Sequence, residues 1–483
     1  MFTETDTIVA PATAVGGALA VIRVAGPAAV AVADRLFRAR RPLADAAGGT
    51  AHYGTIRDGE RVVDEAVATL FRAPRSYTGE DTVEFSCHGS SYVVAEILRL
   101  AIAAGARMAE PGEFTRRAYL NGKLDLSQAE AVADLIAASS RTAHALATNQ
   151  LRGGYSSALD ALRERLVHLA AMLELELDFG EEEVAFADRR ELDALLEAIE
   201  RETERLCGSF ALGNALKEGI AVAIVGAPNV GKSTLLNRLL EEDRAMVSEI
   251  AGTTRDVIEE RLTIDGVLFR LLDTAGIRRT EDRLERMGIE RTLRSLERAQ
   301  IVVRMIDATT LGTGPVPPPD FPLRPDQRLL TVLNKIDALD RDANRSAEKR
   351  PPTTARPTTG AEEDMIPMAA RRATQAESDV IPMAARRGEG VELLRRALRA
   401  AVPTEGLDEG ATVVSSARHH AALTEARTAL ARARRGLSEE LPTDLLSEEI
   451  RSVAAALATI TGRGAILPDE VLQHIFSKFC IGK

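Results

Sequence analysis

The fold is best predicted from one octapeptide, Gly226-Ala227-Pro228-Asn229-Val230-Gly231-Lys232-Ser233. It follows an apolar run over 220–225 that predicts a buried strand, and it precedes a run over 234–240 that predicts a helix. Strand, Gly-rich turn and helix form the setting of a P-loop, in which backbone N–H groups cradle phosphate oxygens at a helix N-terminus. In that setting Lys232 reaches the β- and γ-phosphates, and the Ser233 hydroxyl binds Mg²⁺.

Two further motifs follow in the order typical of a guanine-nucleotide site. Asp273-Thr274-Ala275-Gly276 comes after a second predicted strand, so its carboxylate can hold the Mg²⁺ shell and the Gly276 N–H can reach the γ-phosphate. Thr253-Thr254 lies between the P-loop and this motif, where a switch loop closes on the metal. Asn334-Lys335-Ile336-Asp337 follows a third predicted strand. Asp337 can accept hydrogen bonds from the N1–H and 2-amino group of guanine, which adenine does not offer. The predicted nucleotide is therefore GTP.

Length and composition set the broad class. A chain of 483 residues predicts two to four domains. The formal net charge of −11 argues against a generally basic nucleic-acid binder, although a local basic patch stays open. The three cysteines, Cys87, Cys207 and Cys480, are far apart in the sequence, so a disulfide framework or zinc site is not expected and a reducing cytoplasm fits. No apolar stretch is long enough to span a membrane, so no membrane association is expected.

Segments of different character predict the domain organisation. Residues 1–122 mix short β-rich runs with turns and predict an α+β domain, with strands at 19–24, 66–71 and 83–87 and helices at 27–38 and 91–104. Residues 123–217 and 403–483 are rich in Ala and Leu and predict one helical-bundle domain in two parts. The motifs lie between those parts, so a Ras-like P-loop GTPase domain over 218–402 is expected to be inserted into the helical domain. The fold class is a multidomain mixture of α/β and α+β.

Two helices of the bundle are expected over 157–177 and 189–206. Ser127-Gln128-Ala129-Glu130 has the pattern of a capping box and predicts the start of an earlier helix.

A segment over 338–378 interrupts the GTPase region. It is rich in Arg, Pro, Thr, Ala and Glu and is expected to be disordered or loosely attached. It ends in a near-duplicate, because the sequence of 364–372 returns at 379–387 with a single change. Only the second copy continues into Gly388-Glu389-Gly390 and a predicted helix. The last base-contacting loop is therefore assigned to Ala384-Ala385-Arg386, and the first copy is treated as a local duplication.

With these motifs in view, the chain resembles the MnmE (TrmE) family of tRNA modification GTPases over nearly its whole length. The residues that carry the resemblance, besides the GTPase motifs, are Asp6-Thr7-Ile8-Val9-Ala10, Ser76-Tyr77-Thr78-Gly79-Glu80-Asp81, Pro111-Gly112-Glu113-Phe114-Thr115-Arg116-Arg117-Ala118, Leu120-Asn121-Gly122-Lys123-Leu124-Asp125-Leu126 and Phe479-Cys480-Ile481-Gly482-Lys483. The family's last guanine loop usually begins with Ser, where this chain has Ala384. A backbone N–H can still meet the guanine O6, so this departure puts little in doubt.

The resemblance implies a function. It implies an N-terminal domain that binds 5-formyl- or 5,10-methylenetetrahydrofolate and drives homodimerisation. It also implies addition of a carboxymethylaminomethyl or aminomethyl group to carbon 5 of the wobble uridine of certain tRNAs. The implied partner is the flavin-dependent protein MnmG (GidA), with which the dimer forms a heterotetramer.

The predicted GTPase site lacks the water-orienting group of Ras-like proteins, so another group has to take over that role. Their water-orienting Gln follows the Asp-x-x-Gly motif, and Ile277 stands there in this chain. The resemblance implies that Asn229 and the loop with Ser248, Ile250 and Thr253 bind K⁺, and that Glu285 orients water. By spacing alone Glu285 is a solvated residue at a helix start, and the role of Arg278 is open. The residues assigned to the nucleotide and its ions are Asn229, Val230, Gly231, Lys232, Ser233, Thr234, Ser248, Glu249, Ile250, Ala251, Gly252, Thr253, Thr254, Asp273, Thr274, Ala275, Gly276, Asn334, Lys335, Ile336, Asp337, Ala384, Ala385 and Arg386.

The resemblance also implies the folate residues, which are Arg23, Glu84, Lys123 and Lys483. Taken alone, Arg23 and Lys123 are ordinary surface charges. Cys480 is either a nucleophile that activates uracil C6 or a residue that packs the C-terminal segment, because a thiol reacts only when it is accessible and its pKa is lowered. Two alternatives to the main interpretation stay open. One is a regulatory RNA-binding GTPase without modification chemistry, and the other is a folate-binding scaffold in which the GTPase only drives conformational change.

Overall fold

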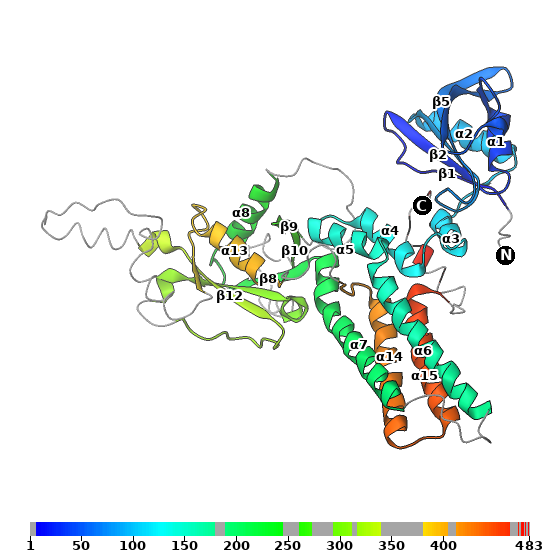
Figure 1. Ribbon diagram of the computed structural model, residues 1–483. Helices are drawn as coiled ribbons and strands as arrows, with labels where there is room; N and C mark the ends of the chain where they lie inside the picture. The colour runs from blue at the N-terminus through cyan, green and yellow to red at the C-terminus, as the bar shows by residue number, and fades with distance from the viewer. Residues whose placement is uncertain are drawn as a thin grey trace, which may run out of the picture. The chain divides into compact units, whose positions relative to one another are not determined.

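The computed structural model describes residues 6–178, 189–244, 260–272, 293–311, 316–339, 380–403, 412–463, 472, 475–477, 479 and 482. The chain divides into two compact units (Figure 1). The first comprises Met1–Ala137, Ala147–Gly208 and Ala417–Lys483, and the second comprises Ala138–Leu146 and Ser209–Ser416. The short segment Ala138–Leu146, which the sequence assigned to the helical region, thus clusters with the unit that carries the GTPase motifs. The finer domain boundaries stay predictions.

The N-terminal part of the first unit is a seven-stranded sheet in the order β3-β4-β5-β6-β2-β1-β7. Neighbouring strands are antiparallel except β1 and β7. Helices α1 (Ala29–Leu36) and α2 (Ser91–Ala103) pack on one face over a buried core that includes Ile22, Phe85 and Ile97. The strands are β1 Ile8–Pro11, β2 Leu19–Ala25, β3 Phe37–Ala39, β4 Thr50–Asp58, β5 Arg61–Phe71, β6 Thr82–His88 and β7 Arg107–Met108.

The predicted helix over 27–38 is too long at its end. The helix α1 stops at Leu36, and Phe37–Ala39 forms the edge strand β3 against β4. The Phe37 ring is buried in the core and lies 5.6 Å from the Phe85 ring, centroid to centroid. Burying this aromatic side chain in the sheet core outweighs continuation of the helix.

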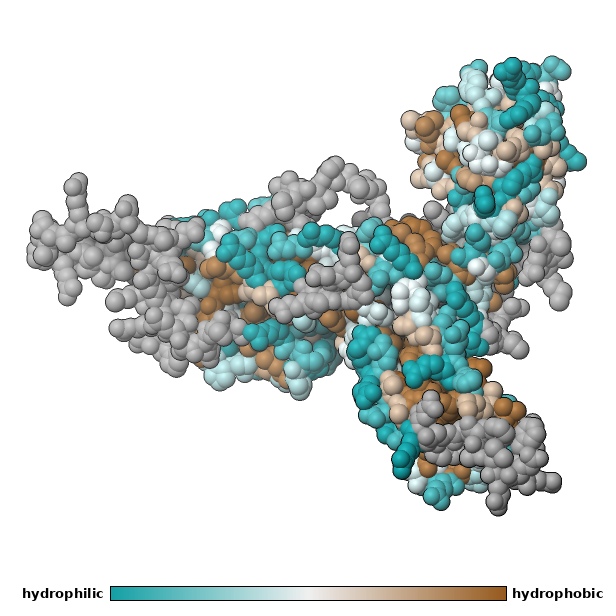
Figure 2. All heavy atoms as spheres, in the orientation of Figure 1, coloured by the Kyte–Doolittle hydropathy of each residue, from teal (hydrophilic) through white to brown (hydrophobic). Residues whose placement is uncertain are grey.

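Long helices form the rest of the first unit. α15 (Thr443–Thr461) packs against α14 (Ala417–Ser438) and α6 (Gly154–Asp178), and α7 (Arg189–Glu218) is ion-paired to α14 through Arg434 and Glu200. Figure 2 shows hydrophilic side chains along the visible face of α7. The shorter helices are α3 Glu113–Leu120, α4 Leu126–Ala137 and α5 Arg141–Leu151. Within the part of the chain that the structure describes, no helix is both long and apolar enough to cross a membrane.

Two predictions about these helices are wrong in detail. The box that begins α4 is formed by Asp125 and Gln128, not by Ser127 and Glu130: the Gln128 N–H donates to Asp125 Oδ1 (2.8 Å), and the Asp125 N–H donates to Gln128 Oε1 (2.9 Å). Ser127 lies inside the helix and is fully buried. The helix predicted over 189–206 continues to Glu218, immediately before the first strand of the second unit.

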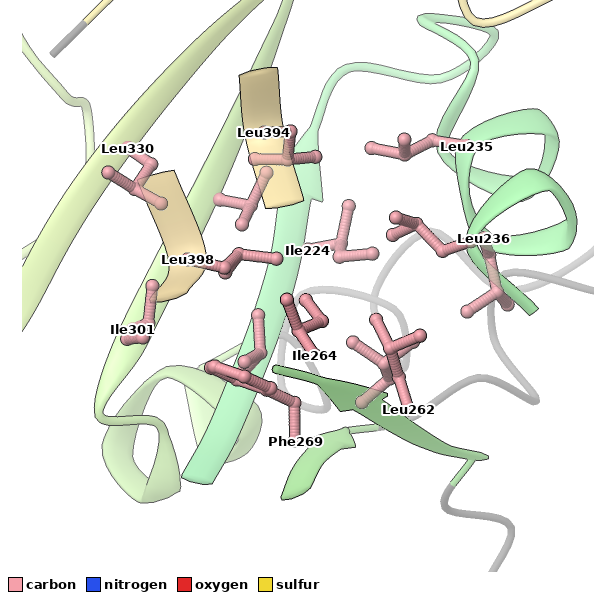
Figure 3. Close-up of a cluster of buried hydrophobic side chains, with 14 of the residues drawn as sticks. Ile224, Leu235, Leu236, Leu262, Ile264, Phe269, Ile301, Leu330, Leu394 and Leu398 are labelled. Atoms are coloured by element: carbon pink, nitrogen blue, oxygen red, sulfur yellow. The ribbon is translucent and has the colours of Figure 1, made fainter. Parts of the chain in front are cut away.

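The second unit contains a six-stranded sheet in the order β13-β12-β11-β8-β10-β9, parallel except for the β9–β10 hairpin. Figure 3 shows Leu235 and Leu236 of α8 and Leu394 and Leu398 of α13 directed toward Ile224 on the sheet. The strands are β8 Ile220–Gly226, β9 Glu260–Ile264, β10 Val267–Leu271, β11 Ile301–Asp307, β12 Arg328–Asn334 and β13 Val380–Pro382, and the helices are α8 Lys232–Arg244 and α13 Val391–Ala400.

The strand order positions the site. β8 is central, with β11 on one side and β10 on the other, so the sheet order reverses at β8. Ligands of such sheets bind beyond the carboxyl ends of the strands at this reversal. The predicted strands and helices around the P-loop, Asn334 and α13 are confirmed, and the P-loop joins β8 to α8 at the carboxyl edge.

Candidate functional site

Two glycines of the P-loop are required by its backbone path. Gly226 has φ of 152°, and a Cβ added there would lie 2.4 Å from the Met305 carbonyl oxygen on β11. Gly231 has φ of 104°, and a Cβ there would lie 2.3 Å from the Asn334 amide nitrogen. Both φ values are in the region that only glycine adopts without strain. The loop thus lies tightly against the carboxyl ends of β11 and β12.

The Asn334 side chain joins the P-loop to the second copy of the duplicated motif. Its amide nitrogen donates to the Val230 carbonyl (2.7 Å), and its amide oxygen accepts from the Ala385 N–H (3.0 Å). Asn334 is 3% exposed, so both contacts are shielded from water. Because one buried amide satisfies a backbone group of each loop, the two loops are held in a fixed relation.

The neighbouring residues continue this arrangement. Lys335 has φ of 66°, and its ammonium pairs with Asp307 Oδ2 at the end of β11 (2.7 Å). Burial works to raise the pKa of Asp307, but the hydrogen bonds from Lys335 and Thr309 outweigh it and leave the pKa below its usual value. Asp337 lies 3.6 Å from Arg387 Nε, and its side chain keeps 20% exposure. A carboxylate at the rim of the loop is thus accessible as an acceptor.

The second copy is built into the sheet. Met383 N–H donates to the Leu333 carbonyl (2.8 Å), and Ile336 N–H donates to the Met383 carbonyl (3.2 Å). Gly390, with φ of 83°, passes so close to Pro382 that a Cβ would lie 2.2 Å from its carbonyl oxygen. Ala384 and Ala385 are buried, and Arg386 is exposed. The first copy, at 364–372, lies outside the described residues.

The phosphate-binding end of the loop is partly described. The Lys232 ammonium donates to the Gly226 and Ala227 carbonyls (2.7 and 2.8 Å), and burial lowers its pKa. Ser233 is half-buried, and Asn229 and Thr234 are exposed. Asn229 has φ of 59°, at the turn of the loop. The assigned residues over 248–254 and 273–276, together with Arg278 and Glu285, lie outside the described residues.

A second cluster surrounds Arg23 in the N-terminal part of the first unit. Arg23 Nε donates to Glu84 Oε1 (2.7 Å) across the β2–β6 ladder, in which the two residues are partners. The guanidinium carbon lies 5.1 Å from the Tyr77 ring centroid and 5.4 Å from that of Phe114. Such ring contacts stabilise a cation that is largely removed from water, and the Arg23 side chain is 13% exposed.

The C-terminal segment reaches this cluster. Arg23 Nη1 lies 3.5 Å from the Gly482 carbonyl oxygen. Gly482, with φ of 97°, lies against β1, where a Cβ would be 2.0 Å from the Pro11 carbonyl oxygen. The neighbouring Phe476 and Phe479 pack with Leu126 in a buried cluster. Cys480 and Lys483 lie outside the described residues.

The structure brings Arg23, Glu84 and Gly482 together but gives Lys123 a different contact. Lys123 Nζ donates to the Pro74 carbonyl (3.1 Å). That carbonyl precedes the loop that supplies Tyr77, so Lys123 is linked to the cluster through the loop. Cys87, on β6, is buried, and burial followed by the Asp64 charge raises the pKa of its thiol to about 11. This thiol is therefore unreactive at neutral pH.

Sequence reasoning missed three residues that shape these sites. Tyr77 and Phe114 lie in motifs that were used only for the resemblance, and nothing in their spacing shows that they face one arginine. Asp307 ends β11, and its position after an apolar run is the kind of signal that identified Asp273.

Comparison with known proteins identifies the family. A model described as "MnmE helical domain" matches residues 126–480, and one described as "GTP-binding protein TrmE N-terminus" matches residues 7–123. Proteins named tRNA modification GTPase MnmE are similar over 99% of this chain. Those of Bacteroides fragilis and Bacteroides thetaiotaomicron are each 44% identical over 99% of their own length, and that of Porphyromonas gingivalis is 45% identical over 98%.

Among solved structures, the FeoB G-domain from Methanococcus jannaschii is 21% identical, covers 38% of this chain and 96% of its own, and has a TM-score of 0.23, too low to support a conclusion. The two family models together span residues 7–480 with a gap of two residues, and the relatives match this chain in length. The chain therefore belongs to the MnmE (TrmE) family.

Proposed function

We propose that this chain hydrolyses GTP and couples that cycle to modification of carbon 5 of the wobble uridine, position 34, in certain tRNAs. The observation that carries the nucleotide assignment is the buried Asn334 amide, which holds the P-loop and the Ala384–Arg386 loop together beside Asp337. The Asp337 carboxylate accepts from the two guanine donors, and a backbone N–H of the second-copy loop meets O6. The relatives' shared name supports the tRNA part of the proposal.

Two ions complete the proposed nucleotide site. Ser233 would hold Mg²⁺ together with Thr254, and an exposed Asn229 at the turn of the P-loop would hold K⁺ together with oxygens of Ser248, Ile250 and Thr253. Mg²⁺ and K⁺ supply positive charge for the phosphates, the part that an arginine finger plays elsewhere. Ile277 leaves the water without the usual Gln, so Glu285 is proposed to orient it. Arg278 is proposed as a further switch residue.

The Arg23 cluster is proposed to bind a tetrahydrofolate derivative, 5-formyl or 5,10-methylene. Folate carries amide-like donors on its pterin ring and carboxylates on its glutamate tail. Glu84 offers an acceptor and Arg23 a cation, and the rings of Tyr77 and Phe114 beside Arg23 offer flat apolar faces. Lys123 and Lys483 would add positive charge. Cys480 is proposed either as a nucleophile that activates uracil C6 or as a residue that packs the C-terminal segment.

The proposed assembly is a homodimer joined through residues 1–122, which binds the flavin-dependent MnmG in a heterotetramer and acts on tRNA in the cytoplasm. The rival function, a regulatory RNA-binding GTPase, has no use for the Arg23 cluster. The contact of that cluster with the C-terminal segment favours the modification enzyme.

The test compares hydrolysis of GTP and ATP with Mg²⁺ in KCl and in NaCl at matched ionic strength. We expect turnover of GTP that depends on K⁺ and little turnover of ATP. Equal GTP turnover in both salts contradicts the K⁺ assignment, and equal use of ATP contradicts the role of Asp337. In parallel, calorimetry with 5-formyltetrahydrofolate compares Arg23→Ala with Arg35→Ala, which changes an exposed arginine that donates to the Ala104 carbonyl. Equal affinity of the two variants contradicts the folate assignment.

A further inference from the structure

The hairpin of β9 and β10 connects the two switch segments of the GTPase unit along the chain. β9 begins shortly after Thr254, and β10 ends just before Asp273. β10 also pairs with β8, the strand that leads into the P-loop. The hairpin turns at Asp265 and Gly266, with φ of 49° and 82°. An Asp-Gly pair with both φ values positive is a tight turn that gives the two strands one register.

Residues at the start of α5 form hydrogen bonds to this turn. Arg141 Nη2 donates to the Asp265 carbonyl (3.1 Å), and the Thr142 N–H and hydroxyl both donate to the Gly266 carbonyl (3.1 and 3.2 Å). A Cβ on Gly266 would lie 2.7 Å from Arg141 Nε. The positive φ at Gly266 favours glycine, and the Arg141 side chain lies close against this turn.

The first turns of α5 are part of the GTPase unit's packing. Ser140 Oγ accepts from the Ala143 N–H (3.2 Å), a contact that starts the helix at this point. Ala143 is buried, and Leu146 packs against the core cluster that contains Leu262 and Ile264 of β9. The turn of the hairpin is thus held by hydrogen bonds from α5, and Leu146 of α5 packs against the same core cluster as β9.

The last turn of α5 belongs to the first unit, where it is fixed by a reciprocal pair of amides. Gln150 Nε2 donates to the Ser127 carbonyl (2.8 Å), and Gln128 Nε2 donates to the Leu151 carbonyl (3.0 Å). Gln128 also forms the box that starts α4. Leu126, the first residue of α4, packs with Phe476 and Phe479 of the C-terminal segment.

We infer that the start of α5 transmits the nucleotide state of the GTPase site to α4 and the C-terminal segment, and that Arg141 and Thr142 are the positioning residues of this coupling. A change in either switch segment displaces the hairpin as one paired unit. The hydrogen bonds from Arg141 and Thr142 to the turn then transmit the displacement to α5. The hydrogen bonds of Gln128 and Gln150 transmit it to α4. Chains of packed and hydrogen-bonded groups carry coupling of this kind, and α5 joins two such sets of contacts. The inference rests on the proposed function, because it concerns how hydrolysis is coupled to modification.

The test uses full-length Arg141→Ala/Thr142→Val and a matched control, Thr148→Val/Arg152→Ala, in which Thr148 lies farther along α5 and Arg152 directly follows it. Hydrogen exchange is measured with GDP and with a non-hydrolysable GTP analogue. We expect wild type and control to show nucleotide-dependent exchange in peptides over 123–151, and the double variant to lose it. GTP turnover of the double variant should stay within about three-fold of wild type, while tRNA modification falls at least about ten-fold. Arg141→Lys, which keeps a donor, should recover part of the modification.

Unchanged nucleotide-dependent exchange in the double variant overturns the inference. So does loss of nucleotide affinity in parallel with modification, because the two residues would then only stabilise the GTPase unit. If the wild-type protein supports no tRNA modification, the proposed function is wrong. The hydrogen-exchange comparison tests the coupling independently of that result.

Discussion

Substitution of Asn334 by Ala is expected to weaken GTP binding, because Asn334 is the only described side chain that hydrogen-bonds both the P-loop and the second-copy loop. The change removes the bonds to the Val230 carbonyl and the Ala385 N–H. A neutral hydrogen bond contributes about 0.5–1.5 kcal/mol, so two contribute about 1–3 kcal/mol. If this free energy is needed to hold both loops in the binding geometry, GTP affinity falls roughly 5- to 150-fold.

The control for this experiment is Gln327→Ala. Gln327 lies just before β12, at the end of the strand opposite Asn334, and its amide donates to the Leu296 and Ala299 carbonyls. Its loss should lower the unfolding midpoint without a matching loss of nucleotide affinity. The assay is equilibrium titration with a fluorescent GDP or GTP analogue, with thermal unfolding of both variants alongside. An equal fall of GTP affinity in the two variants would show that the two Asn334 hydrogen bonds have no specific part in nucleotide binding.

Three further predictions address hydrolysis, pH and the insert. Glu285→Ala should keep GTP affinity and lower turnover by about two orders of magnitude, since a water-positioning group acts in the transition state; stopped-flow binding with steady-state hydrolysis checks this, and equal losses would make Glu285 structural. Glu130→Gln should cost about 3–5 kcal/mol at pH 7, because it leaves Arg418 and the buried His419 without their carboxylate partner. Burial alone raises the pKa of Glu130, but the charges of His419 and Arg418 hold it at about 2, below the usual 4.5. A lowered pKa stabilises the folded state above the unfolded pKa, so the difference between variant and wild type should shrink as pH falls below about 4.5; a denaturant midpoint gap that widens on acidification would contradict it. Deletion of residues 341–376 should leave solubility and GTP turnover intact, whereas a product that does not bind GTP would mean that the first copy forms the guanine loop.

Local chemistry explains which parts of the site are visible in the sequence. The P-loop and Asn334 motifs are short, and their geometry is set by a few consecutive backbone angles, such as those of Gly231 and Lys335. The strands on which they lie are apolar runs with sharp ends. Position in the sheet then follows from the parallel strand order, so the meeting of these motifs at one edge was predictable.

Other features depend on contacts between distant segments. Gly266 lies 124 residues from Thr142 in the sequence, and no local pattern at either residue predicts the hydrogen bond between them. The Arg23 cluster joins β2, β6, the loop with Tyr77, α3 and the C-terminal segment, and Gly482 is 459 residues from Arg23 in the sequence. At the start of α4, Asp125 and Ser127 both fit the capping pattern, and burial of Leu126 in the cluster with Phe476 selects Asp125. Tertiary packing decides between local patterns of equal quality.

The most direct test of the central claim, that GTP hydrolysis by this chain is coupled to wobble modification, is mass spectrometry of wobble nucleosides. tRNA is taken from a strain that lacks the gene and is complemented with the wild-type chain or with Lys232→Ala, which removes the P-loop ammonium. We expect carbon-5 modified uridines to be missing in the deletion strain, to return with the wild-type chain and to stay missing with Lys232→Ala. Unchanged modified nucleosides in the deletion strain, or full recovery with Lys232→Ala, would contradict it.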